Sequence, residues 1–343
     1  MKARWRGGRG AAWVIAAGLS LSACGGPQQE APREPLVADP PVGSSEGAAA
    51  GAAGTELQRG IAYIKNEKYE EAKAHLDNAL ELKPDNAEAA YYLALVREKT
   101  GDRPGAEAAY RKALENDPGL AEAALNLAAL YLDEPPRPDE AITVLSAAVE
   151  KAPDQARLYQ NLAYAYGLKK DVANASKAYE GAIAKGAAGA DVHFAYGLML
   201  FEAKELDRAA AELKKALAVA GDDAAMLATI GRMLGPVKAY GDCVKAFDRA
   251  LKLKPDLAEL YVRRGTCRHE LNDEEGARAD YAGAIKADPK FAAAHYYLGL
   301  SYLVDKKRQR AYSALEQAAR HGGDTEIGKR AREKMKMLVK PAR

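Results

Sequence analysis

The residues of this sequence that could carry out chemistry are few and widely spaced. No two of the five histidines stand at metal-ligand spacing with a third ligand close by. The sequence contains no Gly-x-Ser-x-Gly, no phosphate-binding Gly-rich loop ending in Lys-Ser/Thr, and no Cys-x-x-Cys. We therefore predict a protein that is not an enzyme, with no catalytic residues, no metal, no cofactor and no small-molecule substrate. The histidines, interpreted as structural or surface residues, are His75, His193, His269, His295 and His321.

Cys24 is the one cysteine in a recognisable local context. Residues 1–10 carry four basic groups and no acid, and residues 11–23 are uncharged and mostly apolar. A helix over 11–23 would span about 20 Å, which is short of the roughly 30 Å of a bilayer core. A basic head followed by a short apolar run is typical of a signal peptide, which we place at residues 1–23.

The stretch Leu21-Ser22-Ala23-Cys24 resembles the bacterial lipobox. That resemblance implies cleavage before Cys24, attachment of lipid to its thiol and acylation of the new N-terminus. The alternatives are an uncut signal anchor and ordinary secretion. Gly25 after the cysteine is similar to the pattern of outer-membrane lipoproteins, so we expect an outer-membrane anchor facing the periplasm. The sorting rule differs between bacterial groups, so the inner membrane stays open.

The charge balance gives no sign of a nucleic-acid partner. The whole chain has a net charge of +2, but four of its 50 Lys and Arg residues precede the apolar run. A chain cut after residue 23 keeps 46 basic residues against 48 acidic ones, a net charge of −2. Residues 25–54 are rich in Pro, Gly, Ala and Ser and show no helical or strand period, so we interpret residues 24–54 as the lipidated cysteine and a disordered linker.

Small residues recur every 34 or 35 positions from residue 60 onward. Because small side chains let two helix axes approach to about 8–10 Å, this spacing predicts repeated units of two helices joined by a tight turn. Large residues, such as Tyr110, Tyr179, Phe247 and Tyr281, are expected to fill the gaps between neighbouring units. The three series are Gly60, Ala94, Ala128, Ala163, Gly197, Gly231, Gly265 and Gly299; Ala72, Ala106, Ala141, Ala175, Ala209, Cys243, Ala277 and Ala311; and Ala79, Ala113, Ala148, Ala182, Ala216, Ala250, Ala284 and Ala318.

This pattern resembles the tetratricopeptide repeat (TPR), in eight repeats over residues 55–325. The resemblance implies an all-α, right-handed superhelical solenoid of about eight helix hairpins, with a groove lined by the first helix of each repeat. Repeat three has an extra residue within 133–140, and Gly235-Pro236 should end or kink the first helix of repeat six. Residues 326–343 are expected to form a basic capping helix; contact of that helix with anionic lipid or a partner is the alternative.

The groove is the surface that the resemblance marks for binding. The Lys and Asn clamp of chaperone-binding TPRs is not expected, because only Asn126 fits a clamp position and Glu122 places the wrong charge. Aromatic and aliphatic residues instead favour a helix or an extended apolar peptide, with Asn and Arg fixing its register. Packing between helices is the alternative for each single aromatic residue. The groove residues are Tyr91, Leu95, Asn126, Asn161, Tyr164, Phe194, Leu198, Phe201, Arg232, Arg263, Tyr296 and Leu300, and we expect the partner to dock around Tyr164, Phe194 and Phe201.

Cys243 and Cys267 lie 12 residues before and 12 residues after Pro255, which marks the turn between two antiparallel helices. The two thiols should therefore lie at the same height, and an oxidising envelope permits a disulfide bond between them. Two free buried thiols acting as small apolar residues are the simpler interpretation.

Taken together, these patterns favour a membrane-anchored scaffold that binds and positions envelope proteins or peptides through its groove. The sequence is similar to TPR lipoproteins that pilot pilus secretins, serve gliding motility or organise cell-wall enzymes. The alternative is a periplasmic or surface chaperone-like adaptor for secreted chains. No nucleic-acid partner is expected.

Overall fold

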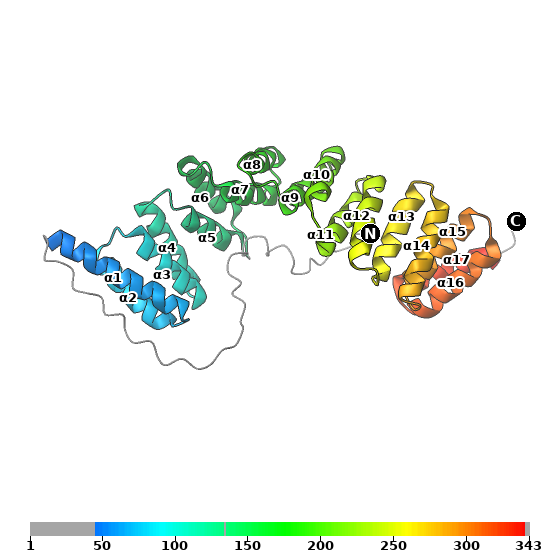
Figure 1. Cartoon of the computed structure of the whole chain (residues 1–343), viewed down its shortest axis with the longest axis horizontal. Coiled ribbons are helices and arrows are strands. Elements are labelled where there is room, and N and C mark those ends of the chain that lie inside the picture. Colours follow the sequence, from blue (N-terminus) through cyan, green and yellow to red (C-terminus); the bar gives the residue numbers. More distant parts are fainter. Residues whose placement is uncertain (1–44, 134, 340–343) are drawn as a thin grey trace. The chain divides into compact units, whose positions relative to one another are not determined.

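The computed structural model describes residues 45–133 and 135–339, and these residues form 17 α-helices and no strand (Figure 1). The chain divides into two compact units, residues 1–186 and 187–343. The helices of the first unit are α1 (Ser45–Lys65), α2 (Tyr69–Leu82), α3 (Ala87–Lys99), α4 (Arg103–Asn116), α5 (Ala121–Leu132), α6 (Pro138–Lys151), α7 (Ala156–Leu168) and α8 (Val172–Ala184). Those of the second unit are α9 (Ala190–Glu202), α10 (Leu206–Val219), α11 (Ala224–Leu234), α12 (Tyr240–Leu253), α13 (Ala258–Glu270), α14 (Glu274–Ala287), α15 (Ala292–Val304), α16 (Arg308–Gly322) and α17 (Glu326–Val339).

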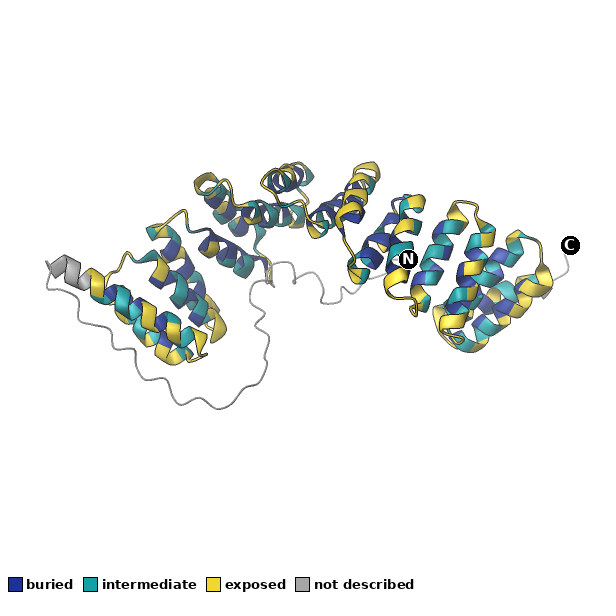
Figure 2. Cartoon of the chain, in the orientation of Figure 1, coloured by how far each residue is buried: buried dark blue, intermediate teal, exposed yellow. Residues whose placement is uncertain are grey.

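Successive helices pair into eight hairpins, from α1–α2 to α15–α16, so the predicted fold class is confirmed. Every member of the three small-residue series is buried, and Figure 2 shows buried segments in dark blue within the hairpins. Gly299 illustrates the reason, because a Cβ atom there would lie 2.8 Å from Leu315 Cγ and 3.3 Å from the carbonyl oxygen of Ala311. A larger residue in these positions would force the two helices of a hairpin apart.

The large residues expected between repeats are also buried, but they pack first within their own hairpin. A Cβ on Gly231 would lie 2.9 Å from the ring of Phe247, and one on Gly265 would lie 2.6 Å from the ring of Tyr281. Tyr281 also stacks on Tyr297 of the next repeat, with 5.9 Å between ring centroids. One side chain thus joins a hairpin internally and to its neighbour.

The turn inside most hairpins follows one backbone pattern. A residue with positive φ follows the first helix, and the next N–H donates to the carbonyl five residues back. In repeat six, Lys238 has φ 60° and the N–H of Ala239 donates to Leu234 O at 2.9 Å. This left-handed closing residue is a common way to satisfy the last carbonyl groups of a helix. The positive-φ positions are Glu67, Gly101, Lys170, Lys204, Lys238, Asn272 and Lys306.

Repeats three and six depart from the pattern where the sequence predicted. In repeat three the N–H of Arg137 donates to Tyr131 O, six residues back instead of five, because the turn holds one extra residue. In repeat six, α11 ends at Leu234, directly before Gly235-Pro236, and is shorter than the other first helices. Pro236 has no N–H to continue the helix, so the predicted early end is confirmed.

The predicted linker was too long at its C-terminal end, because α1 begins at Ser45 and so extends ten residues ahead of the predicted first repeat. The run of Ala and Gly at 47–54, which we interpreted as linker, is helical. Alanine has the highest intrinsic helix propensity, and Ala53 and Leu57 of this helix are buried. The remainder of the predicted linker, the signal peptide and Cys24 lie outside the described residues.

The C-terminal helix α17 packs on the last hairpin through the predicted apolar face. Ala331 is fully buried in a cluster with Leu315 and Ala318, and Ile327, Met335 and Leu338 pack against that cluster. The basic side chains Lys329 and Arg330 face solvent. The helix therefore covers apolar surface that a ninth repeat would otherwise bury.

Candidate partner-binding face

We call the outer surface of the first helices of the hairpins, α1 to α15 in odd numbers, the first-helix face of each unit. The groove residues expected from the sequence lie on these helices. The structure describes all twelve: nine are half-buried, Arg232 is exposed, and Asn161 and Tyr296 are buried. Their exposure decides which of them could contact a partner.

In the first unit, Tyr91 and Asn126 lie on neighbouring first helices and contact each other. The amide nitrogen of Asn126 donates to the hydroxyl of Tyr91 at 3.5 Å, and both side chains are half-buried. Burial, together with the nearby carboxylate of Glu122, raises the pKa of the Tyr91 phenol, so this side chain stays a neutral donor and acceptor at physiological pH. The pair offers a partner one amide and one hydroxyl at fixed spacing.

Asn161 occupies the position of Asn126 one repeat later, but it is buried. Its amide nitrogen donates to the carbonyl of Arg157 at 2.9 Å, while its Oδ1 is buried without a hydrogen-bond partner among the described residues. An unsatisfied buried acceptor costs about 1–3 kcal/mol. The side chain is therefore less available than predicted, and its position is not explained by stability.

Tyr164 on α7 and Phe194 and Phe201 on α9 are all half-buried. Tyr164 belongs to the first unit, and the two phenylalanines belong to the second. Each ring exposes part of its surface within its own unit. That the three side chains form one docking surface stays a prediction.

Tyr296 is not available on the first-helix face, so its assignment to the groove needs correction. Its side chain is 7% exposed and packs in the cluster that α17 completes, in T-shaped contact with Tyr297 at 5.5 Å. Burial raises the pKa of its phenol. The comparison of repeats could not show the part of this cover that comes from Ala331, because α17 lies outside the repeat array.

Arg232 and Arg263 lie on α11 and α13 of the second unit. Arg263 is held by Glu259, with Nε 2.7 Å from the carboxylate. Arg232 is exposed and donates to the hydroxyl of Thr229 at 2.8 Å, and no carboxylate of the described residues pairs with it. Of the two, Arg232 is the guanidinium that could bind an acidic group of a partner.

Arg232 lies at the rim of a cleft of about 510 Å³ between α11 and the start of α13. The sequence interpretation missed this cleft, although a comparison of equivalent repeat positions would have indicated it. Its walls include Ala228 and Leu260, and it extends to Phe291 at the start of α15. A second cleft of about 460 Å³ opens in the first unit above Leu127 and Tyr131, between α4 and α6.

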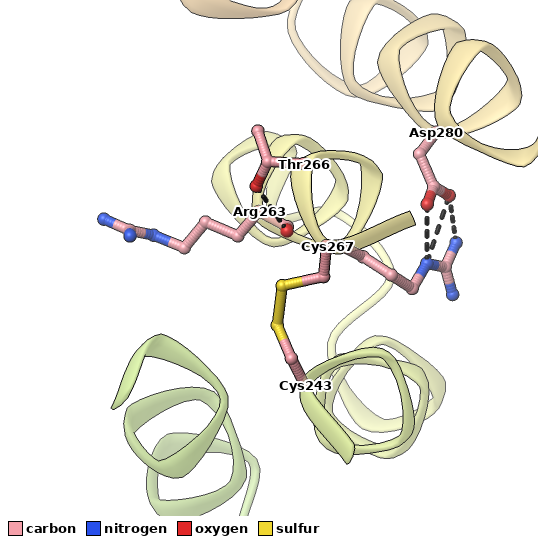
Figure 3. The surroundings of a disulfide bond; sticks show 6 residues. Cys243, Arg263, Thr266, Cys267 and Asp280 are labelled. Atoms are coloured by element: carbon pink, nitrogen blue, oxygen red, sulfur yellow. Dashed lines mark hydrogen bonds and ion pairs between the residues drawn. A yellow bond between two sulfur atoms is a disulfide. The ribbon is translucent and has the colours of Figure 1, made fainter. Parts of the chain in front are cut away.

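Cys243 of α12 and Cys267 of α13 are joined by a disulfide bond, with their Cα atoms 6.3 Å apart (Figure 3). The bond thus links the second helix of the sixth hairpin to the first helix of the seventh, in the buried layer between them. On α13, Arg263 points away from the pair of sulfur atoms, and Asp280 lies on the far side of that helix. The bond is placed just after the early end of α11, where Gly235 lies beside the sulfur of Cys267.

His75 and His193 take structural positions in the part of the chain that the structure describes, whereas His269 is exposed. His193 is buried and its Nδ1 lies 2.8 Å from Glu212, while His75 pairs with Glu56 at 2.7 Å and stacks on Tyr63. Across residues 45–133 and 135–339, no three His, Cys, Asp or Glu side chains gather in a way that could hold a metal ion. None of the helices in these ranges combines the length and apolarity needed to cross a membrane.

The tetratricopeptide-repeat family model matches residues 57–121, 93–156, 161–225, 240–290 and 270–326, which is well over half of the chain. The chain therefore belongs to the tetratricopeptide repeat family, and it is a protein-interaction scaffold of that family.

Among curated proteins, the chain is similar to the type IV pilus assembly protein PilF of Pseudomonas aeruginosa, with 32% identity over 126 residues. The match covers 36% of this chain and 50% of PilF, so the chain spans about half the length of this relative. The solved structure of Pseudomonas aeruginosa pilF has 24% identity and a TM-score of 0.47, covering 60% of this chain and 94% of that one. The structure of MamA from Desulfovibrio magneticus RS-1 has 22% identity and a TM-score of 0.44, and the match covers 50% of this chain and 98% of that one. The structure of yeast Tom70 has 17% identity and a TM-score of 0.44, and the match covers 83% of this chain and 64% of that one.

Proposed function

We propose that this protein is a lipid-anchored scaffold of the bacterial envelope that binds other envelope proteins through its first-helix face and serves the assembly of type IV pili. The observation that carries the binding role is the cleft beside Arg232, where the face is hollowed and a guanidinium has no carboxylate partner among the described residues. Ligand-binding sites commonly combine an apolar pocket with a few polar groups that fix orientation.

The first-helix face of the first unit supports the same role. Tyr91 and Asn126 present polar groups beside half-buried ring surface, which is a suitable surface for the backbone of an extended segment. Aromatic residues with a polar end are enriched where proteins bind one another. The uncompensated amide oxygen of Asn161 is a cost of the kind that proteins retain at functional sites.

Two features support a location in the bacterial envelope and a role in type IV pilus assembly. The motif Leu21-Ser22-Ala23-Cys24 follows a basic head and a short apolar run, as in lipoprotein signals. The similarity to a type IV pilus assembly protein supports a role in that machine. A lone acyl chain holds a protein to a membrane only marginally, whereas two or more hold it firmly. Lipid on the thiol of Cys24 together with acylation of its amino group would supply more than one chain.

The anchor is tested by changing Cys24 to Ala in the full chain. The variant should lose incorporation of an alkyne-labelled fatty acid and leave the membrane fraction or persist as an uncut precursor. The double variant Cys243→Ala and Cys267→Ala is the matched control, because it removes the other two cysteines and should keep both label and membrane retention. Labelling and processing of the Cys24 variant as in the unchanged protein would refute the anchor.

The pilus role is tested by deleting the gene in its native host and counting type IV pili on the cell surface. Pili should be lost or strongly reduced, and the unchanged gene should restore them whereas the Cys24→Ala gene should not. Normal numbers of pili in the deletion strain would rule out this role while leaving a scaffold of another envelope machine.

A further inference from the structure

The cleft in the second unit, which we call the repeat-six cleft, exists because one large side chain of the repeat pattern is missing. The position three residues before each first-series small residue is Leu57, Tyr91, Leu125, Gln160, Phe194, Ala228, Val262 and Tyr296 in repeats one to eight. Repeat six is the one repeat with alanine there. The absent side chain leaves room beside Ala224, Ala225 and Ala228 on α11, opposite Leu257 and Leu260.

The apolar surface of the cleft is exposed to a degree unusual for its residues. Leu257, at the start of α13, is 45% exposed, and Phe291 closes the same end from the start of α15 as a half-buried ring. A volume of about 510 Å³ lies within the range of sites that bind a small molecule or part of a peptide. The space therefore fits a large side chain together with some of the backbone that carries it.

The charges at the rim differ between the two ends of the cleft. Arg232, one turn after Ala228, replaces the leucine of repeats two, five and eight, which is Leu95, Leu198 and Leu300. At the other end, Lys254, Asp256 and Asp288 lie in the turns that precede α13 and α15. Glu259 already pairs with Arg263, so it does not neutralise Arg232. A carboxylate is therefore favoured at the Arg232 end and disfavoured at the end that carries two aspartates.

We propose that the repeat-six cleft binds a segment of a partner protein by taking in one large apolar side chain, Leu, Phe or Tyr, while an Asp or Glu of the same segment pairs with Arg232. This inference rests on the proposed function, because it names the kind of segment that the first-helix face recognises. The side chain that the repeat lacks is supplied by the partner, and the guanidinium fixes the direction in which the segment lies.

The experiment selects 12-residue peptides from a random phage-displayed library against the full chain without its first 23 residues. An enriched peptide is then synthesised with a fluorescent label and its dissociation constant is measured by anisotropy. Enriched sequences should place Leu, Phe or Tyr close to Asp or Glu. Replacing either of these peptide residues by Ala should weaken binding about tenfold or more, as for other buried anchors.

Two protein variants locate the site. Ala228→Phe restores the side chain of Phe194 to this position and fills the cleft, and Arg232→Leu restores the residue of Leu198 while leaving the cleft open. Both should weaken the peptide about tenfold or more with unchanged helicity and melting temperature. Lys245→Leu on the exposed side of α12 is the matched control and should bind as tightly as the unchanged protein. Because Arg232 is exposed, its variant keeps the test valid if Ala228→Phe folds poorly.

The outcomes separate this inference from the proposed function. Enrichment of no sequence, or binding that neither variant weakens, overturns the repeat-six cleft as the recognition site. Peptides that bind elsewhere on the first-helix face, weakened by Phe201→Ala but not by Arg232→Leu, also overturn it and leave the scaffold role standing. If the scaffold role itself were wrong, no partner protein would be found bound to this face in the cell.

Discussion

Glu107 of α4 and Arg137, directly before α6, form an ion pair with 2.6 Å between Oε2 and Nη2, and this pair connects two successive repeats. Tyr131 at the end of α5 completes the cluster. Its hydroxyl donates to Glu107 at 3.2 Å, and the guanidinium of Arg137 lies 4.3 Å from the centroid of its ring. The cluster holds the one hairpin turn that carries an extra residue.

This cluster predicts a specific acid sensitivity. The hydrogen bond and charge of Arg137, with the hydroxyl of Tyr131, hold the pKa of Glu107 below its ordinary value of 4.5. A carboxyl whose pKa is lower in the folded state stabilises the fold above its unfolded pKa and loses that contribution as pH falls through the folded value. Glu107→Gln should therefore lower the free energy of unfolding by about 1 kcal/mol at pH 7 and by less at pH 3, measured by urea titration at each pH.

The matched control is Glu115→Gln on the same helix, where the carboxylate is exposed and its contact with Lys112 is 3.6 Å. That variant should unfold as the unchanged protein does at both pH values. An equal loss of stability for Glu107→Gln at pH 7 and pH 3 would contradict the assigned role of the ionised carboxylate.

The disulfide bond predicts that oxidised protein carries no free thiol at positions 243 and 267. Its sequence separation of 24 residues corresponds to about 3 kcal/mol of stabilisation in the chain-entropy description. Reduction, or the double variant Cys243→Ala and Cys267→Ala, should lower stability by that order. Alkylation of the unreduced, denatured protein followed by mass spectrometry checks the bond, and two labelled cysteines would disprove it.

The small residues of the first series predict a size limit that differs between two nearby glycines. A Cβ on Gly265 would lie 2.6 Å from Tyr281 and 3.1 Å from Cβ of Asp280, whereas one on Gly241 would meet nothing within 4 Å. Gly265→Ala should destabilise the second unit by about 1–3 kcal/mol through overpacking. Gly241→Ala, near the start of α12, should be neutral or stabilise by up to about 1 kcal/mol. Thermal unfolding followed by circular dichroism compares them, and equal effects would contradict the packing argument.

The fold could be predicted from the sequence because the same pattern of small residues at helix contacts recurs in each repeat. A small residue allows two neighbouring helices to pack closely whatever the distant parts of the chain do. Eight copies of this pattern in register therefore define the hairpins. The start of α1 was not predictable in the same way. Residues 45–54 lie outside the repeat, and a run of alanine and glycine is compatible both with a linker and with an extended first helix.

The binding face was harder to predict, because exposure depends on what covers a residue. Tyr296 and Phe194 occupy the same repeat position, yet Tyr296 is buried in a cluster with residues of α16 and α17 while Phe194 stays half-buried. The repeat-six cleft depends on the small side chain of Ala228, where the other repeats have a larger residue. A search for aromatic or charged groups one residue at a time does not detect such a position. Comparison of equivalent positions across repeats would have found it.

The central claim, that the first-helix face binds a partner protein, is tested most directly by photocrosslinking in the native host. The photoreactive residue p-benzoylphenylalanine is placed at position 232 on this face, or at position 245 on α12, where the Lys245 side chain is 71% exposed. We expect one discrete crosslinked envelope protein from position 232 and none from position 245. Equal crosslinking from both positions, or a broad mixture of proteins from position 232 as a chaperone would give, would contradict it.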